Sequence, residues 1–164
     1  MLPVKTLWCF LCILLSAATA GCPSRGDRQE AGNYAYTDKM GRTVHVTVPV
    51  RRAVVLNTYE LVSTLDAWSS VAAVGKWACN SDLVLATFPG VRSLPVVGVG
   101  TDVNMESLVR QSPDVVLTWS FRPELVRFME KNGLSVIAVY PDSISELYDV
   151  LRMHGKLFGR EERA

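Results

Sequence analysis

The chain has 164 residues and a formal net charge of +1; 49% of the residues are hydrophobic and 20% are charged. This composition excludes an intrinsically disordered chain, and the length fits one domain of ordinary size. The near-zero net charge argues against a nucleic-acid binder, because neutralising a run of phosphates needs a clear excess of Lys and Arg. The lack of repeated long apolar runs excludes a protein that spans a membrane many times.

The first residues have the order of a secretory signal peptide. Lys5 precedes an apolar run over 7–15, and small residues follow up to Ala20. A positive start, a short apolar core and a small-residue exit are the parts of such a peptide. We expect a signal peptide over 1–21, and an uncut anchor helix is the alternative.

Two cleavage sites compete at the end of this segment. Ala18-x-Ala20 suits an ordinary signal peptidase, whereas Gly21-Cys22 resembles the end of a bacterial lipobox, with Thr19 at the position usually held by an aliphatic residue. The polar segment 22–33 predicts a flexible tether. We favour cleavage before Cys22 and lipidation of its thiol, which would leave Cys79 unpaired. A Cys22–Cys79 disulfide in an oxidising compartment is the alternative.

The next segment, 34–48, predicts a β-hairpin. Val44, Val46 and Val48 alternate with polar residues, and the turn-forming sequence over 38–41 separates them from the first strand. After the hairpin, short apolar runs alternate with helix-length segments. We expect strands over 53–56, 71–74, 95–99, 115–118 and 134–139, and helices over 59–68, 82–88, 105–111, 123–132 and 143–158.

This alternation predicts an α/β fold: a parallel sheet covered by helices, preceded by the hairpin and ending in a long helix. Asp102 and Asn104 are candidate caps for the third helix. Ser143, with Glu146 three residues later, has the spacing of a capping box for the last helix.

Ligands of parallel sheets bind outside the carboxyl ends of the strands, here the loops 57–60, 76–80, 98–104 and 119–122. Aromatic rings beside cations in these loops suit a large, flat or anionic ligand. We therefore predict a ligand-binding site made of Tyr59, Trp77, Trp119 and Arg122. Burial in the core is the alternative for Tyr59 and for the neighbouring Phe121.

No catalytic residue, metal site or cofactor is predicted. His45 and His154 are the two histidines, and neither has a Ser or Cys beside it in a nucleophile motif. Cys–His clusters with the spacing of a zinc site are missing, as are phosphate-binding glycine loops.

Five segments in register resemble the iron-siderophore and cobalamin family of ABC-transporter substrate-binding proteins. They cover nearly all of the chain after the signal peptide, and they read Thr37-Asp38-x-x-Gly41-Arg42-x-Val44, Arg52-Ala53-Val54-Val55-Leu56 leading to Glu60-Leu61, Gly98-x-Gly100-x-x-x-Asn104-x-Glu106-x-Leu108, Pro113-Asp114-Val115-Val116-Leu117, and Gly155-x-x-x-Gly159-Arg160-Glu161.

The resemblance implies two α/β lobes joined by a long rigid helix, with the ligand in the cleft between them. The chain would correspond to the amino-terminal lobe over 34–141 and the start of the interlobe helix over 142–164, and would be truncated there. Proteins of this family bind and do not catalyse. We expect capture of an iron complex, a ferric siderophore or heme, because the opening Asp38-x-x-Gly41-Arg42 resembles iron-complex binders. A cobalamin or oxyanion binder stays open, as does a flavodoxin-like enzyme or signalling module.

The resemblance also implies partners and a location. The protein would be exported, lipid-anchored at the outer face of the cytoplasmic membrane or periplasmic, and would serve an ABC permease and its ATPase. Glu106 matches a residue that meets an Arg of the permease, so we expect it to be exposed and away from the ligand. An exposed apolar patch is expected on the last helix, at Leu147, Val150, Leu151, Met153, Leu157 and Phe158.

Overall fold

The computed structural model describes residues 31–99 and 102–164. The expected signal peptide, the expected lipidation site at Cys22, most of the expected tether and Gly100 of the third family segment lie outside these residues. Within the described part, no helix is both long and apolar enough to cross a membrane.

The predicted hairpin is present. β1 (Gly32–Thr37) and β2 (Thr43–Val48) pair antiparallel, from Gly32 opposite Val48 to Thr37 opposite Thr43. β1 begins two residues earlier than the sequence pattern predicts, inside the range expected for the tether. Pairing with Val48 extends the strand there, although Gly32 and Asn33 have low strand propensity.

A six-stranded sheet follows, in the order β6-β5-β4-β3-β7-β8. Its strands are parallel apart from the two-residue β6, which runs antiparallel to β5. Asp102 lies in β6, so its predicted role as a helix cap is wrong, and Asn104 caps the next helix instead. The strands are β3 (Ala53–Val55), β4 (Val71–Gly75), β5 (Val96–Val99), β6 (Asp102–Val103), β7 (Val115–Trp119) and β8 (Val136–Val139).

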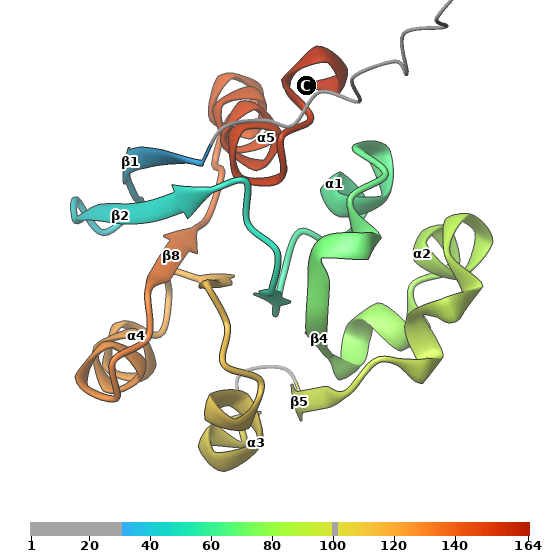
Figure 1. Ribbon diagram of the computed structural model, residues 1–164, viewed down its shortest axis with the longest axis horizontal. Helices are drawn as coiled ribbons and strands as arrows, with labels where there is room; N and C mark the ends of the chain where they lie inside the picture. Colours follow the sequence, from blue (N-terminus) through green and yellow to red (C-terminus); the bar gives the residue numbers. More distant parts are fainter. Residues whose placement is uncertain (1–30, 100–101) are drawn as a thin grey trace, which may run out of the picture.

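Helices cover both faces of this sheet. Figure 1 shows α3 and α4 on one side, and α1, α2 and α5 with the hairpin on the other. The helices are α1 (Tyr59–Thr64), α2 (Asp82–Thr87), α3 (Met105–Arg110), α4 (Pro123–Lys131) and α5 (Ile144–Phe158).

The two faces of the sheet form two separate cores. In β3, Ala53 and Val55 pack with α1, α5 and the hairpin, whereas Val54 packs with Leu108 of α3 and Met129 of α4. Successive side chains of a strand point to opposite faces, and here both faces are covered. The apolar strands β3 and β8 are therefore fully buried, whereas Val96 and Val99 of β5 stay exposed.

The first helix is shorter than predicted. α1 ends at Thr64, and Asp66 adopts a left-handed backbone conformation with φ of 52°. A short 3-10 helix over Trp68–Ser70 follows in place of the predicted last turn. The break turns the chain toward β4 and buries Trp68, whose ring stacks on Phe88 at 5.0 Å.

The apolar patch expected on α5 is only partly exposed. The hairpin and α1 pack on this helix and bury four of the six residues, Val150, Met153, Leu157 and Phe158, while Leu151 is half-buried. Of the predicted residues only Leu147 is exposed, and Ile144 and Tyr148 are exposed beside it. The prediction fails because the hairpin folds back over this helix, and the sequence pattern of the helix does not show this.

A buried carboxylate fixes the hairpin to the sheet. Asp38, in the turn between β1 and β2, accepts hydrogen bonds from the backbone N–H of Met40 and Arg42, at 3.0 and 3.1 Å, and from that of Ala138 in β8, at 3.2 Å. It also pairs with the Arg42 guanidinium, which reaches Glu130 of α4 at 2.6 Å. Asp38 and Arg42 together therefore connect the turn, β8 and α4.

Asp38→Ala should lower the free energy of unfolding by about 3 kcal/mol, because it leaves the partly buried Arg42 without its main counter-charge. The matched control is Asp149→Ala, which removes an exposed ion pair with Arg152 and should cost about 1 kcal/mol or less. Urea unfolding followed by circular dichroism measures both. Equal losses in the two variants would contradict the role given to Asp38.

Candidate functional site

The carboxyl ends of β3, β4, β7 and β8 open onto a depression of about 650 Å³, here called the edge pocket. Parallel strands place their carboxyl ends at the same edge of a sheet, and ligands of such folds bind there. The residues that line it come from the loops after these strands and from the first turns of α1 and α5: Thr58, Tyr59, Glu60, Leu61, Trp77, Asn80, Ser81, Trp119, Pro141 and Leu147.

The structure places three of the four predicted ligand residues at this pocket. Trp77, directly after β4, is 52% exposed, and Trp119, at the end of β7, is half-buried. Arg122 is exposed but does not line the pocket. The chain turns at the start of α4, and this separates Arg122 from the pocket wall although it is only three residues from Trp119.

Tyr59 contributes little surface, because its side chain belongs mainly to the core. It is 6% exposed, and its hydroxyl donates to the Leu56 carbonyl at 2.6 Å. A Cβ on Gly75 would lie 2.6 Å from this hydroxyl, so a glycine is needed at that position of β4. Burial raises the pKa of the Tyr59 phenol well above its ordinary value. Tyr59 is therefore mainly a core residue, which is the alternative stated for it from the sequence.

Three aromatic rings cluster beside the edge pocket, and Trp119 is the one of them that lines it. Trp119 stacks with Phe121 at 6.0 Å and meets Tyr140 edge-on at 5.9 Å, and Phe121 and Tyr140 lie 6.1 Å apart. Phe121 and Tyr140 are each about half exposed, at 50% and 49%. Sequence reasoning missed Tyr140, although it directly follows β8 and the same rule about strand ends selects it.

Glu60 brings a negative charge into the pocket. It lies in the first turn of α1, is exposed, and accepts a hydrogen bond from the Ser81 hydroxyl at 3.1 Å. Ser81 also caps α2, where its hydroxyl accepts from the backbone N–H of Val84 at 3.4 Å. The carboxylate is thus held between the starts of two helices.

A buried polar network lies behind the pocket wall. The fully buried His154 of α5 bonds to the Val150 carbonyl through Nδ1, at 2.8 Å, and to the Thr58 hydroxyl through Nε2, at 3.1 Å. A carbonyl only accepts, so Nδ1 carries the proton and Nε2 accepts from Thr58. Thr58 itself has a left-handed backbone with φ of 51°, which is uncommon for a β-branched residue. The network connects α5 to this unusual residue of the pocket lining.

Burial lowers the pKa of His154 to about 4. The ring is therefore neutral near pH 7, and both of its nitrogens are engaged. His45, the other histidine, is exposed on β2, as its place in the alternating strand predicts. Among the described residues, no group of three or more His, Cys, Asp or Glu could hold a metal ion. Neither histidine lines the edge pocket.

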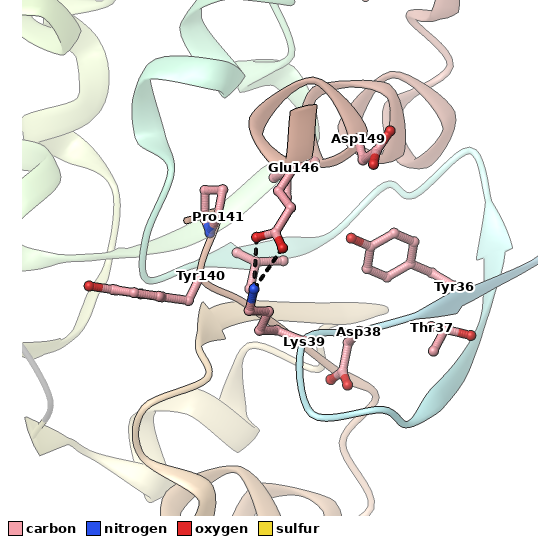
Figure 2. Close-up of a pocket in the computed structure, with 10 residues that line it drawn as sticks. Tyr36, Thr37, Asp38, Lys39, Tyr140, Pro141, Glu146 and Asp149 are labelled. Atoms are coloured by element: carbon pink, nitrogen blue, oxygen red, sulfur yellow. Dashed lines mark hydrogen bonds and ion pairs between the residues drawn. The ribbon is translucent and has the colours of Figure 1, made fainter. Parts of the chain in front are cut away.

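A second, smaller hollow of about 170 Å³ lies between the hairpin turn and α5. Figure 2 shows the Lys39 amino group reaching the carboxylate of Glu146, while the Tyr140 ring points away from it. Lys39 bonds to Glu146 at 2.7 Å and to Asp142 at 2.9 Å. The hydrogen bonds to Glu146 and Asp142 raise the pKa of Lys39, and the bond from Lys39 lowers that of Glu146.

These bonds hold the start of α5 against the hairpin, and that start carries Leu147 of the edge pocket. Ser143 caps the helix by accepting from the Glu146 N–H at 3.2 Å. The reciprocal half of the predicted capping box is shifted by one residue, because the Glu146 carboxylate accepts from the backbone N–H of Asp142 at 2.9 Å. Because each charged residue that lines it is held in an ion pair, we assign this hollow a structural role.

Glu106 lies on α3, on the sheet face opposite to α1, α2 and α5. Its side chain is 82% exposed, it pairs with Arg110 one turn later at 2.6 Å, and it does not line the edge pocket. The predicted exposure is confirmed, and its separation from a bound ligand stays a prediction. Its role toward a permease stays a prediction.

No protein-family model and no curated protein match the chain, but solved structures do. The molybdate-bound periplasmic binding protein MolA of Haemophilus influenzae matches with a TM-score of 0.71 and 21% identity, over 79% of this chain and 48% of its own. CeuE of Helicobacter pylori, in complex with Ni-His, matches with a TM-score of 0.70 and 23% identity, over 78% of this chain and 43% of its own. A protein of the Fe3+-hydroxamate ABC transport system of Saccharomonospora viridis matches with a TM-score of 0.61 and 22% identity, over 79% and 50%.

The chain therefore has the fold of one half of the periplasmic solute-binding proteins of ABC transporters, which confirms the fold expected from the family resemblance. It spans about half the length of the solved structures that it matches.

The buried His154 should make the free energy of unfolding depend on pH. The unfolded chain binds a proton on His154 below pH 6.5, whereas the folded protein binds it only near pH 4. Acidification through this window therefore favours the unfolded state, by about 2 kcal/mol between pH 7 and pH 5.

His154→Gln should remove most of this loss between pH 7 and pH 5, because glutamine does not titrate. His45→Gln is the matched control and should keep the loss, since His45 is exposed. Urea unfolding of the three proteins at both pH values measures the effect. A His154→Gln protein with the full pH dependence would rule out His154 as its source.

Proposed function

We propose that the chain provides the substrate-binding component of an ABC importer and that its edge pocket captures an iron complex, a ferric siderophore or heme. The observation that carries this proposal is an aromatic-lined pocket at the carboxyl edge of a sheet with the solute-binding fold. Its volume of about 650 Å³ lies within the range of small-molecule sites.

The chemistry of the wall supports a large organic complex. The rings of Trp77 and Trp119 offer flat apolar surface, and such rings contribute most of the contact energy in sites of this kind. An iron complex carries its metal inside an organic shell, so the protein needs no metal ligand of its own to hold it. One of the matched structures belongs to an Fe3+-hydroxamate transport system, and the Asp38-x-x-Gly41-Arg42 opening resembles iron-complex binders.

We propose that the protein binds its ligand and does not catalyse a reaction on it. The two histidines have structural environments, one exposed on a strand and one buried with both ring nitrogens bonded. The edge pocket is open on one side, so a second surface is needed to enclose a ligand. In the matched structures, the part outside the match accounts for about half of each chain or more.

Location and partners belong to the same proposal. The signal peptide over 1–21 would export the chain, and a lipid on Cys22 with the tether over 22–33 would hold it at the membrane surface. An ABC permease with its ATPase would receive the ligand. Glu106, exposed on α3, would pair with a cation of the permease and orient the binding protein.

Direct titration tests the function. The purified chain should quench its tryptophan fluorescence on addition of a ferric trihydroxamate or heme, and isothermal calorimetry should give one site. Cobalamin and molybdate test the alternatives within the family, and a nucleotide tests the flavodoxin-like alternative. Binding of the nucleotide alone would overturn the proposal.

Trp119→Ala should weaken binding of whichever iron complex is found by about tenfold or more, since an aromatic contact is lost. The half-buried position of Trp119 predicts a small loss of stability. The matched control is Trp68→Ala, which removes a ring that is 6% exposed and should cost about 3–5 kcal/mol of unfolding free energy. Calorimetric titrations and thermal melts decide the matter; a Trp119→Ala protein with full affinity would exclude this ring from the site.

Glu106→Arg should abolish uptake when the binding protein is assayed with its permease in proteoliposomes, while ligand affinity stays within about twofold, because pairs of this kind set encounter and register. Glu124→Arg is the matched control, since Glu124 is an exposed first-turn Glu of α4 paired with Arg127. Normal uptake by the Glu106→Arg protein would show that Glu106 is only a helix-end charge.

A further inference from the structure

We infer that the edge pocket selects neutral or cationic iron complexes over anionic ones, and that Glu60 is the residue that sets this preference. The inference rests on the proposed function and narrows its substrate class. The charge of the pocket lining differs from the charge that the sequence suggested, which was a site with cations beside the aromatic rings.

Glu60 is the only residue with a charged side chain among those that line the edge pocket. The two cations that the sequence placed nearby, Lys76 and Arg122, are exposed and do not belong to the lining. The described part of the pocket therefore presents a net negative charge to a ligand.

Within residues 31–99 and 102–164, no cation pairs with this negative charge. No Lys, Arg or His of the described residues forms an ion pair with Glu60, whereas the exposed Glu106 and Glu124, also in first helical turns, are each paired with an Arg. The recorded side-chain partner of Glu60 is the neutral hydroxyl of Ser81, at 3.1 Å. The Glu60 carboxylate is oriented by this hydrogen bond and has no cationic partner among the described residues.

The aromatic rings of the lining also favour cationic ligands. The face of a tryptophan ring is electron-rich and attracts cations, and Trp77 and Trp119 both line the pocket. A protonated amine at the edge of an iron complex could contact Glu60 while the apolar shell of the complex covers the two rings. A complex with several negative charges would meet repulsion from Glu60 and no cation of the lining to offset it.

A series of three ferric complexes of different charge tests this inference. Ferrioxamine B is cationic, ferrichrome is neutral and ferric enterobactin is a trianion, so the metal stays the same while the charge changes. Calorimetric titration of the purified chain at low and high salt should show the cationic complex binding about tenfold or more tightly than the trianion. The affinity for the cation should fall with salt, and that for the neutral complex should stay nearly constant.

Glu60→Gln should lower the affinity for the cationic complex by about three- to tenfold and leave that for the neutral complex unchanged, because only the charge is removed. Glu60→Lys should reverse the order of the cation and the trianion. Glu106→Gln is the matched control and should change neither affinity. Thermal melts of the variants confirm folding, which the exposed position of Glu60 favours.

The outcomes separate the two proposals. If the trianion binds as tightly as the cation, or if Glu60→Gln weakens the cationic and neutral complexes equally, the inference is wrong while the proposed function stands. If neither these complexes nor heme bind, the proposed function fails and the inference fails with it.

Discussion

The direction of the strands is the constraint on which the rest of this structure depends. β3, β4, β5, β7 and β8 run parallel, so their carboxyl ends meet at one edge of the sheet. Four of these ends supply the lining of the edge pocket, and residues distant in sequence, such as Trp77 and Trp119, come to share one wall. Helices on both faces bury most of the sheet, and ligands of such folds bind at the carboxyl edge.

The hairpin supports that edge from outside the sheet. Asp38 connects its turn to β8, and Lys39 connects the same turn to Asp142 and Glu146 at the start of α5. Behind the pocket, His154 joins α5 to Thr58 through a buried hydrogen bond. Both ends of α5 are thus fixed, and with them the position of Leu147 and the rim beside Tyr140. The shape of the edge pocket therefore depends on ion pairs and hydrogen bonds made mostly by side chains that do not line it.

Much of this could be predicted from the sequence, because periodicity reports which faces of an element are buried. The hairpin and the five parallel strands were identified, and the rule about strand ends led to Trp77 and Trp119. Failures occurred where tertiary packing decides. Arg122 lies outside the pocket lining because the chain turns at the start of α4, and α5 is covered by a hairpin that precedes it by about 100 residues in sequence. Tyr140 directly follows β8, so the rule about strand ends applies to it as well.

The central claim is that the edge pocket holds an iron complex, and locating the iron tests it most directly. Crystals of the chain grown with a ferric trihydroxamate should show an anomalous iron signal in the edge pocket, with the organic shell against Trp77 and Trp119. An iron signal outside this pocket in every copy, or none at saturating concentrations of the complex, would contradict the claim.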